Sequence, residues 1–262
     1  DPGFPLIRPI VTRHDVGILP VPVDDNGLDI TCGIQNYPDA RFALITPAHQ
    51  SPLGVALSLA RRHQILEWAD RSQAWIIEDD YDSEFRYHGK PLPALKSLDA
   101  PQRVIYAGTF SKALFPALRC AWLVLPVKQI AQFRHQASLA PCAVPVLWQN
   151  TLADFLREGH FWRHLKKMRQ HYAQRRQWIE QALTQQGFQV VPQKGGIQMV
   201  IRMIGDDIAH ARKANAAGLA VQALSDWRIR SSGEGGLLLS FTNIVNEGMA
   251  RQVAQQLRKA LS

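Results

Sequence analysis

The chain has 262 residues, of which 46% are hydrophobic and 20% charged, and its formal net charge is +8. These proportions are ordinary for a folded globular protein and unlike those of disordered or fibrous chains. Its apolar runs are shorter than the roughly 18 residues that suggest a membrane-spanning helix, so no membrane segment is expected. The three cysteines, Cys32, Cys120 and Cys142, form no CxxC pair. We therefore expect no disulfide framework and no zinc or other metal site, and a reducing, cytoplasmic location fits.

The first residues, Asp1-Pro2-Gly3-Phe4, are typical of a turn. They include no initiator Met, no basic segment and no long apolar segment, so they do not resemble a signal peptide. We expect the sequence to be a part of a longer protein.

Four short apolar runs in the first half of the chain predict β-strands, at residues 42–45, 74–77, 104–107 and 121–125. Each run is apolar throughout, which is typical of strands buried on both faces of a parallel sheet. Between the first two runs, residues 54–71 carry Ile65, Leu66 and Trp68 at positions that fit an amphipathic helix. Strand, helix and strand in this order indicate a βαβ unit and an α/β fold.

The second half of the chain predicts a smaller α+β region. A helical pattern runs from residue 146 to 183, is interrupted at Gly159 and ends before Gly187. Further strands are expected at residues 188–191, 197–201 and 237–241, and further helices at residues 208–217 and 247–260. The glycine-rich residues 231–236 are expected to form a loop.

Basic residues are concentrated between residues 157 and 176 of the expected long helix. They are Arg157, Arg163, Lys166, Lys167, Arg169, Arg175 and Arg176, with His160, His164 and His171 among them. Basic patches attract nucleic acid, but no zinc-finger spacing, aromatic RNA-binding motif or clear helix-turn-helix is present. We interpret this stretch as the solvated face of a long helix.

Polar side chains follow two of the expected strands. Strand 74–77 continues into Glu78-Asp79-Asp80-Tyr81-Asp82, and strand 104–107 continues into Gly108-Thr109-Phe110-Ser111-Lys112, with Arg119 shortly after. In open α/β sheets, ligands bind at the carboxyl ends of strands. Pyridoxal phosphate has a cationic ring nitrogen, a phenolic oxygen, an aldehyde and a phosphate, which match these carboxylates, hydroxyls, amine and guanidinium.

These residues resemble fold-type I aminotransferases, and more closely the aminotransferase-like domain of the MocR subfamily of GntR-type transcription regulators. The matching segments are residues 1–4, 46–54, 76–87, 108–119 and 152–176, and the resemblance extends over nearly the whole chain. It implies an α/β fold with a large pyridoxal-phosphate-binding domain at residues 1–160, whose sheet is mostly parallel. It also implies a small C-terminal α+β domain at residues 161–262.

The resemblance implies roles for the residues closest to the cofactor's ring. Lys112 matches the lysine that forms an aldimine with pyridoxal phosphate. Asp79 matches the aspartate that keeps the ring nitrogen protonated, and Tyr81 matches the phenol near the ring oxygen.

The phosphate and the ring face have matches as well. Arg119 and Thr109 match phosphate ligands, with Ser111 a weaker match, and Phe4 lies where the family has an aromatic ring stacked on the pyridine. Packing in the core is an equally good interpretation of Phe4. Ser51 falls where many aminotransferases have an asparagine, and we assign it no role.

Other polar residues of the motifs have structural interpretations. His49 is expected to be a structural hydrogen-bonding residue rather than a general base. Asp80, Asp82 and Glu84 are expected to cap loops or to pair with Arg86.

The sequence departs from the family at two places. The glycine-rich phosphate loop and the winged-helix DNA-binding domain would both precede Asp1 in a MocR-type regulator. In addition, Leu238 aligns with the arginine that binds the substrate carboxylate in aminotransferases, and Arg228 and Arg230 are the only nearby candidates. This second departure makes cofactor binding better supported than turnover.

Three functions remain open. The first is a pyridoxal-phosphate-binding effector or sensor domain of a transcription regulator, the second a catalytically active aminotransferase, and the third a truncated remnant that binds the cofactor weakly. The resemblance also implies a homodimer, a small amine or amino-acid effector, and DNA binding only through the winged helix. No membrane association is expected.

Overall fold

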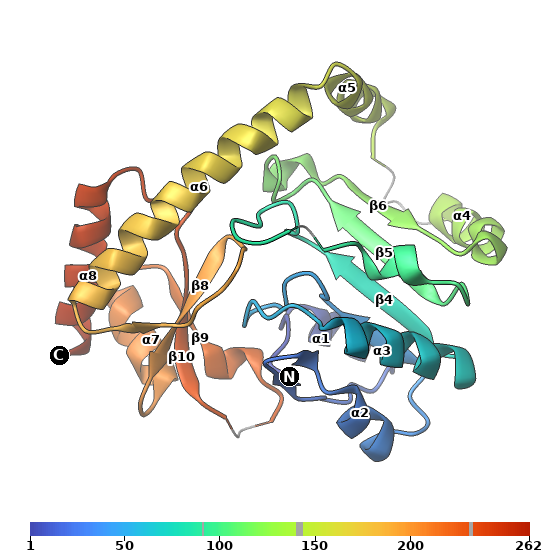
Figure 1. The fold of residues 1–262 in the computed structure, drawn as a ribbon, viewed down its shortest axis with the longest axis horizontal. Coiled ribbons are helices and arrows are strands. Elements are labelled where there is room, and N and C mark those ends of the chain that lie inside the picture. Colours follow the sequence, from blue (N-terminus) through green and yellow to red (C-terminus); the bar gives the residue numbers. More distant parts are fainter. Residues whose placement is uncertain (91, 140–143, 231–232) are drawn as a thin grey trace.

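The computed structural model describes residues 1–90, 92–139, 144–230 and 233–262. It contains two four-stranded sheets and a two-stranded ribbon, and helices flank the sheets (Figure 1). One sheet is formed by the first half of the chain and has more residues in its strands, and we call it the larger sheet. Its strands lie in the order β3 (Phe42–Ile45), β4 (Trp75–Asp80), β5 (Val104–Thr109) and β6 (Ala121–Val124). All four predicted strands are thus present.

The predicted parallel sheet is confirmed for three of its four strands. β3, β4 and β5 are parallel, whereas β6 runs antiparallel to β5. Burial on both faces was wrong for the two outer strands, since Phe42 in β3 is 58% exposed and Leu123 in β6 is 51% exposed. An apolar run predicts a strand, but it specifies neither the direction of that strand nor its place in the sheet.

The predicted helix between β3 and β4 is present. α3 (Leu59–Arg71) begins after Ser58, whose side chain accepts a hydrogen bond from the Arg61 backbone as an N-cap. Its buried residues Ile65 and Leu66 pack in one cluster with Ile76 of β4. This packing covers one face of the two central strands near their starts, where Ile76 and Val104 are paired.

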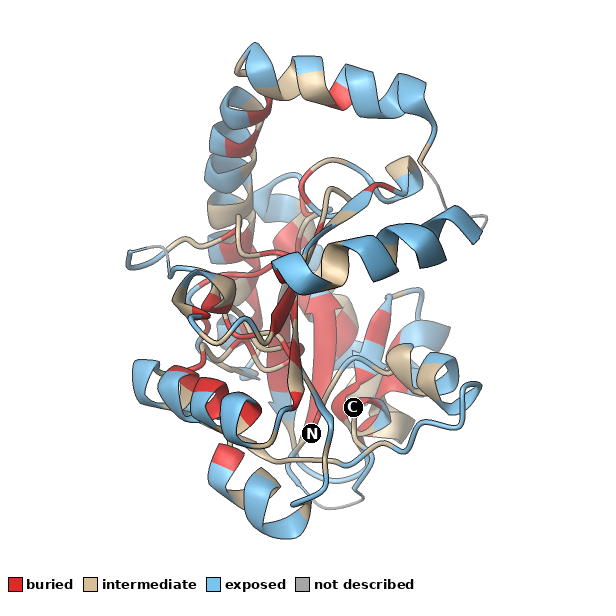
Figure 2. Ribbon diagram, turned by 90° about the vertical axis from the view of Figure 1, so that its right-hand side faces the viewer, coloured by how far each residue is buried: buried red, intermediate tan, exposed pale blue. Residues whose placement is uncertain are grey.

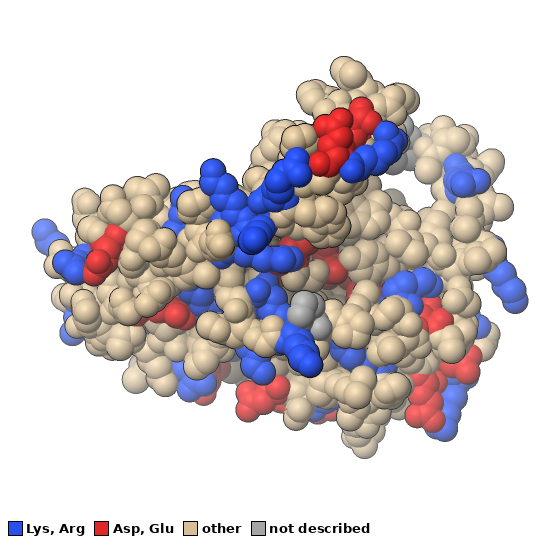
Figure 3. Space-filling model, turned by 45° about the horizontal axis from the view of Figure 1, so that its top comes forward, with Lys and Arg blue, Asp and Glu red and all other residues tan. Residues whose placement is uncertain are grey.

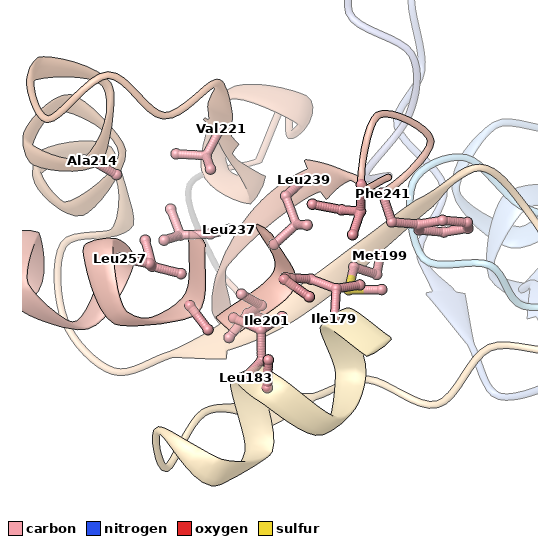
Figure 4. Packing of buried hydrophobic residues seen from close by; sticks show 14 of the residues in the cluster. Ile179, Leu183, Met199, Ile201, Ala214, Val221, Leu237, Leu239, Phe241 and Leu257 are labelled. Atoms are coloured by element: carbon pink, nitrogen blue, oxygen red, sulfur yellow. The ribbon is translucent and has the colours of Figure 1, made fainter. Parts of the chain in front are cut away.

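The smaller sheet is antiparallel and has the order β7 (Gln189–Val190), β8 (Gln198–Met203), β10 (Gly235–Ser240) and β9 (Val221–Ala223). α6 (His160–Gln185), α7 (Asp207–Ala216) and α8 (Glu247–Leu261) supply the helical side of its core. Figure 4 shows Leu183 of α6 and Leu257 of α8 close to the sheet residues Ile201 and Leu237. The predicted mixture of helices and strands in this half is therefore confirmed.

β10 begins earlier than the sequence suggested. Gly235 and Gly236 are strand residues rather than part of a loop, while residues 231 and 232 lie outside the described part of the chain. A Cβ atom at position 236 would lie 3.0 Å from the Ile201 carbonyl oxygen. Glycine here permits the close approach of β8, which explains why a loop-forming residue occurs inside a strand.

The predicted interruption of the long helical pattern at Gly159 and its end before Gly187 are confirmed. α5 (Val146–Arg157) ends shortly before Gly159, which has a φ of 73°, and α6 starts at the next residue. Gly187, with a φ of 81°, follows the end of α6. Glycine adopts these left-handed conformations without the strain that a side chain adds.

α6 contacts both halves of the molecule. Its first turns place Phe161 and Leu165 in a cluster with Phe85 and Ala113, and its last turns place Leu183 in the core of the smaller sheet. Most of its basic residues are exposed, as predicted, but Arg176 is buried and donates to Glu180 and to the Gly195 carbonyl oxygen. A division of the chain at residue 160 stays a prediction.

The remaining elements are short and lie mainly at the periphery. They are α1 (Ile7–Thr12), β1 (Val23–Asp24), β2 (Gly27–Leu28), α2 (Ile30–Asn36), α4 (Ile130–Leu139) and the 3-10 turns Leu95–Leu98, Pro116–Leu118, Val127–Gln129 and Leu224–Trp227. Figure 2 shows the buried residues gathered around the sheets and the largely exposed surfaces of the outer helices. In the described ranges, no helix has the length and apolarity needed to cross a bilayer.

Candidate functional site

The site is built where β4 and β5 end side by side. Asp79 of β4 lies opposite Ala107 of β5, and Asp80 lies opposite Gly108. β4 extends through Asp80, so Asp79 is a strand residue. The carboxylates therefore lie next to the segment that leads from β5 into Lys112.

Asp79 is a partly buried carboxylate in an acidic environment. Burial, followed by the charges of Asp80 and Asp82, raises its pKa to about 6. Within the described residues, its carboxylate makes no hydrogen bond and no ion pair. A cationic group placed beside it would relieve this unfavourable environment.

The two neighbouring carboxylates, Glu78 and Asp80, differ from Asp79 because they already accept hydrogen bonds from other groups of the protein. Glu78 accepts hydrogen bonds from the backbone nitrogens of Leu95 and Lys96 at 2.7 and 2.8 Å. Asp80 caps the following loop through Ser83 and also accepts from the Tyr106 hydroxyl at 2.7 Å. The expected role of Asp80 as a loop cap agrees with these contacts.

Tyr81 is partly buried beside a histidine. Its hydroxyl lies 3.0 Å from His49 Nδ1, and its pKa is well above the ordinary value because of burial and the charge of Asp82. Tyr81 thus stays protonated at neutral pH and is able to donate a hydrogen bond.

Hydroxyl groups and cations follow the end of β5. Thr109 Oγ1 lies 3.0 Å from Ser111 Oγ and accepts from the Ser111 backbone nitrogen at 3.1 Å. Lys112 and Arg119 are exposed, and Arg119 has a left-handed backbone with a φ of 50°. Among the residues that the structure describes, no ion pair connects Lys112 with Asp79 or Arg119 with another site residue.

Phe4 packs against the C-terminal half of the molecule. Its side chain is 47% exposed, and its ring is tilted against Trp227 with a centroid distance of 5.9 Å. The backbone nitrogen of Gly3 donates to the Trp227 carbonyl oxygen, and Asp1 accepts from the backbone nitrogens of Ile229 and Arg230. The first residues therefore pack against the segment that follows β9, and the stacking role of Phe4 stays a prediction.

The position of the missing arginine is apolar. Leu238 is 2% exposed and packs with Val200, Leu224 and Trp227. Arg230 donates instead to the Tyr37 hydroxyl at 3.0 Å. A substrate carboxylate thus finds no cation at Leu238.

Two features of the region were not predicted from the sequence. His49 and Asp82 line a cavity of about 210 Å³, which is closed on one side by Gly195 and Gly196. The expected pairing of Asp82 or Glu84 with Arg86 is not found among the described residues. The Gly195-Gly196 pair was the sequence signal for this cavity. Its significance is apparent only in the folded structure, where the two halves of the chain lie together.

The residues present fit pyridoxal phosphate by their chemistry. Asp79 is an anionic group without a cationic partner in the described chain, Tyr81 is a protonated phenol, and Thr109 and Ser111 offer hydroxyls. Lys112 supplies an exposed amine. No cluster of three or more His, Cys, Asp or Glu side chains suited to a metal ion occurs in the parts of the chain that the structure describes.

Several known proteins with similar sequences are transcription regulators. A sequence model of the family described as aminotransferase class I and II matches residues 1–233. The HTH-type transcriptional regulator YdeL of Bacillus subtilis is 41% identical over 70% of this chain and 39% of its own length. The probable rhizopine catabolism regulatory protein MocR of Rhizobium meliloti is 34% identical over 99% of this chain and 53% of its own length. The chain thus spans about half the length of these relatives, or less.

Solved structures agree on the fold. The kynurenine aminotransferase of Pyrococcus horikoshii, solved with PMP and kynurenine, superposes with a TM-score of 0.89 at 24% identity. The match covers 99% of this chain and 67% of that one. The predicted α/β aminotransferase fold is confirmed.

Proposed function

We propose, on the premise that this chain belongs to the class I and II aminotransferase family, that it is a pyridoxal-phosphate-binding sensor domain of a transcription regulator. The observation that carries the proposal is Asp79. It is a partly buried carboxylate without a cationic partner in the described chain, at the strand end beside the Lys112 segment. Such an environment suits a protonated ring nitrogen.

Each proposed ligand has a distinct task. Lys112 would hold the cofactor through its amine, and Asp79 would accept a hydrogen bond from the protonated ring nitrogen. Tyr81 donates to the ring oxygen, which its raised pKa supports. When bound, pyridoxal phosphate supplies an electron-withdrawing ring that stabilises negative charge on an attached amine substrate.

The phosphate and the ring face complete the proposed site. Thr109 and Ser111 offer hydroxyls that already lie 3.0 Å apart, and Arg119 offers a guanidinium suited to bidentate phosphate binding. Phe4 is proposed to pack against the ring face, although its ring contact in this structure is with Trp227.

A sensor is favoured over an enzyme by Leu238. Turnover of amino acids requires that the substrate carboxylate be held in a fixed position, and Leu238 lies in an apolar cluster. Amine binding at Lys112 needs no such cation. A regulator of this kind would take a small amine or amino acid as effector, bind DNA through a winged helix elsewhere in the whole protein, and form a homodimer.

Cofactor binding is tested by absorbance. We expect the purified chain to develop a visible band with pyridoxal phosphate, and borohydride to fix the cofactor on the peptide that contains Lys112, as detected by mass spectrometry. Lys112→Ala should remove the band, whereas Lys128→Ala, which changes an exposed lysine of a distant turn, should keep it. A reducible band of equal intensity in Lys112→Ala would show that the assignment is wrong, and no band in the wild-type chain would favour the remnant.

Sensor and enzyme are separated by product formation. The loaded protein is mixed with amino acids and a keto acid, and the new keto acid is measured by chromatography. We expect the absorption band to shift without accumulation of product. Steady product formation that exceeds the amount of protein would instead establish the aminotransferase.

A further inference from the structure

The cavity beside the proposed cofactor site is a separate space. It measures about 210 Å³ and lies between the loop after β4, the segment around His49, the Gly195–Gly196 pair and Arg169 of α6. Figure 3 shows acidic atoms set into a hollow on this face, beside a band of Lys and Arg atoms. None of the seven residues proposed to hold the cofactor lines it, and neither does Leu238.

Asp82 presents an unsatisfied anion to this cavity. Its side chain is 2% exposed, and neither carboxylate oxygen has a hydrogen-bond partner within the described residues. His49 Nδ1 lies 3.3 Å from Asp82 Oδ2, but its hydrogen-bonding contact is with the Tyr81 hydroxyl at 3.0 Å. A buried carboxylate without donors is costly, which points to a ligand that supplies them.

The same cavity also contains buried nitrogen atoms without partners. His49 Nε2 and Arg86 Nε are buried and make no hydrogen bond in the described part of the chain. Arg169 lies at the exposed rim, where it donates to the Glu84 carbonyl oxygen. Unsatisfied acceptors and nitrogens thus face one space without satisfying each other.

Ionisable groups of both signs line the cavity. Asp82 and Glu84 contribute two carboxylates, and Arg86 and Arg169 contribute two guanidinium groups. Burial and the nearby carboxylates raise the pKa of Glu84 to about 7, so a further negative charge close to the acidic side is unfavourable. A ligand that carries both signs and no net charge adds no net charge to the cavity and meets both kinds of unsatisfied group.

We propose that this cavity is a noncovalent binding site for a small zwitterion. The ligand's ammonium group donates to Asp82, and its carboxylate or similar anion accepts from Arg86 and Arg169. Because the bound ligand contacts His49, and His49 contacts Tyr81, occupancy also affects the hydroxyl that we assign to the cofactor's ring oxygen. That last consequence rests on the proposed function, whereas binding itself does not.

The probe is N,N-dimethylglycine, titrated calorimetrically into the cofactor-free chain. Its tertiary ammonium retains one N–H donor, and a tertiary amine cannot condense with an aldehyde. Isovalerate has the same shape and carboxylate but carries no positive charge. We expect saturable binding of dimethylglycine and at least tenfold weaker binding of isovalerate.

Variants locate the bound probe. Asp82→Asn should weaken binding of dimethylglycine at least tenfold, and Arg169→Gln should weaken it at least threefold. Asp70→Asn removes a carboxylate from the exposed side of α3 and should leave binding unchanged. If Asp82→Asn does not fold, Glu84→Gln takes its place, with an expected loss of at least threefold.

Four results would overturn the proposal: no saturable binding, equal binding of isovalerate, equal binding by the Asp82 and Arg169 variants, or loss of binding once borohydride has fixed the cofactor on the chain. The last result would place the probe in the cofactor site. The absorption band attributed to Lys112 is measured separately, so failure of this site and failure of the proposed function are distinguishable.

Discussion

At the scale of single residues, neighbouring carboxylates acquire different properties from their surroundings. Glu78 is satisfied by two backbone nitrogens and Asp80 by two hydroxyls, whereas Asp79 has a raised pKa and no partner in the described chain. The sequence predicted that this acidic run was important. It did not predict which of these carboxylates accept hydrogen bonds from the protein, because the donors are residues 83, 95, 96 and 106, which lie outside the run.

Asp79→Asn should stabilise the cofactor-free chain at pH 8. The folded protein holds the Asp79 proton more tightly than the unfolded chain, so the charge costs stability as the pH rises from about 4 through about 6. The difference between the ordinary pKa of 3.8 and about 6 sets an upper limit of about 3 kcal/mol, and solvent screening reduces the expected gain to about 1–2 kcal/mol. Urea unfolding at pH 8 and at pH 4 measures it.

The gain should shrink toward zero at pH 4, where Asp79 is already protonated in the folded chain. Asp70→Asn, an exposed change in α3, should alter the free energy of unfolding by less than about 0.5 kcal/mol at either pH. The same Asp79 variant should bind pyridoxal phosphate more weakly. A loss of stability at pH 8 would contradict the proposed environment of Asp79.

At the scale of elements, the strands were predicted best where apolar residues are continuous. β4 and β5 were located because buried central strands need apolar side chains on both faces. The direction of β6 was missed because it depends on the chain path between Lys112 and Ala121. α4 was missed because it has no buried residue among those described, and so shows no strong apolar periodicity.

Gly195 and Gly196 illustrate a signal that needs tertiary structure. Gly196 has a φ of 87°, and a Cβ atom there would lie 2.1 Å from His49 Cε1. A Cβ atom at Gly195 would lie 2.7 Å from the Phe85 carbonyl oxygen. Both glycines therefore allow the segment before β8 to lie against the loop that carries Asp82.

Gly196→Ala should lower the free energy of unfolding by more than about 2 kcal/mol, because it adds a clash with His49 to the strain of a left-handed backbone. Gly187→Ala is the matched control. Gly187 has a φ of 81° but no atom within 4 Å of the added Cβ, so only the backbone strain of about 1 kcal/mol applies. Equal losses in urea unfolding would refute the close packing at His49.

At the scale of the whole molecule, apolar side chains remain uncovered at the start of α5. Val146, Leu147 and Trp148 are consecutive and are 68%, 72% and 48% exposed. Such a group on the surface marks an association site more often than an isolated apolar residue does. It supports the homodimer that the sequence resemblance implies.

We expect sedimentation equilibrium to give about twice the chain mass of 29.4 kDa for the wild-type protein. Leu147→Glu combined with Trp148→Glu should shift the protein toward the monomer, because burying these charges in an apolar interface is unfavourable. Ile204→Glu changes an isolated residue that is 97% exposed and should leave the mass unchanged. A wild-type monomer at all concentrations would rule the homodimer out for this chain.

The 26 residues of α6 form one continuous helix that packs against both halves of the molecule. At 1.5 Å per residue it is about 39 Å long, so a tilt of about 5° displaces its far end by about 3 Å. One end packs in the core of the smaller sheet, while near the other end His164 Nε2 lies 2.8 Å from the Ala113 carbonyl oxygen, directly after Lys112. A small rotation of the C-terminal half would thus be amplified into a displacement beside the amine.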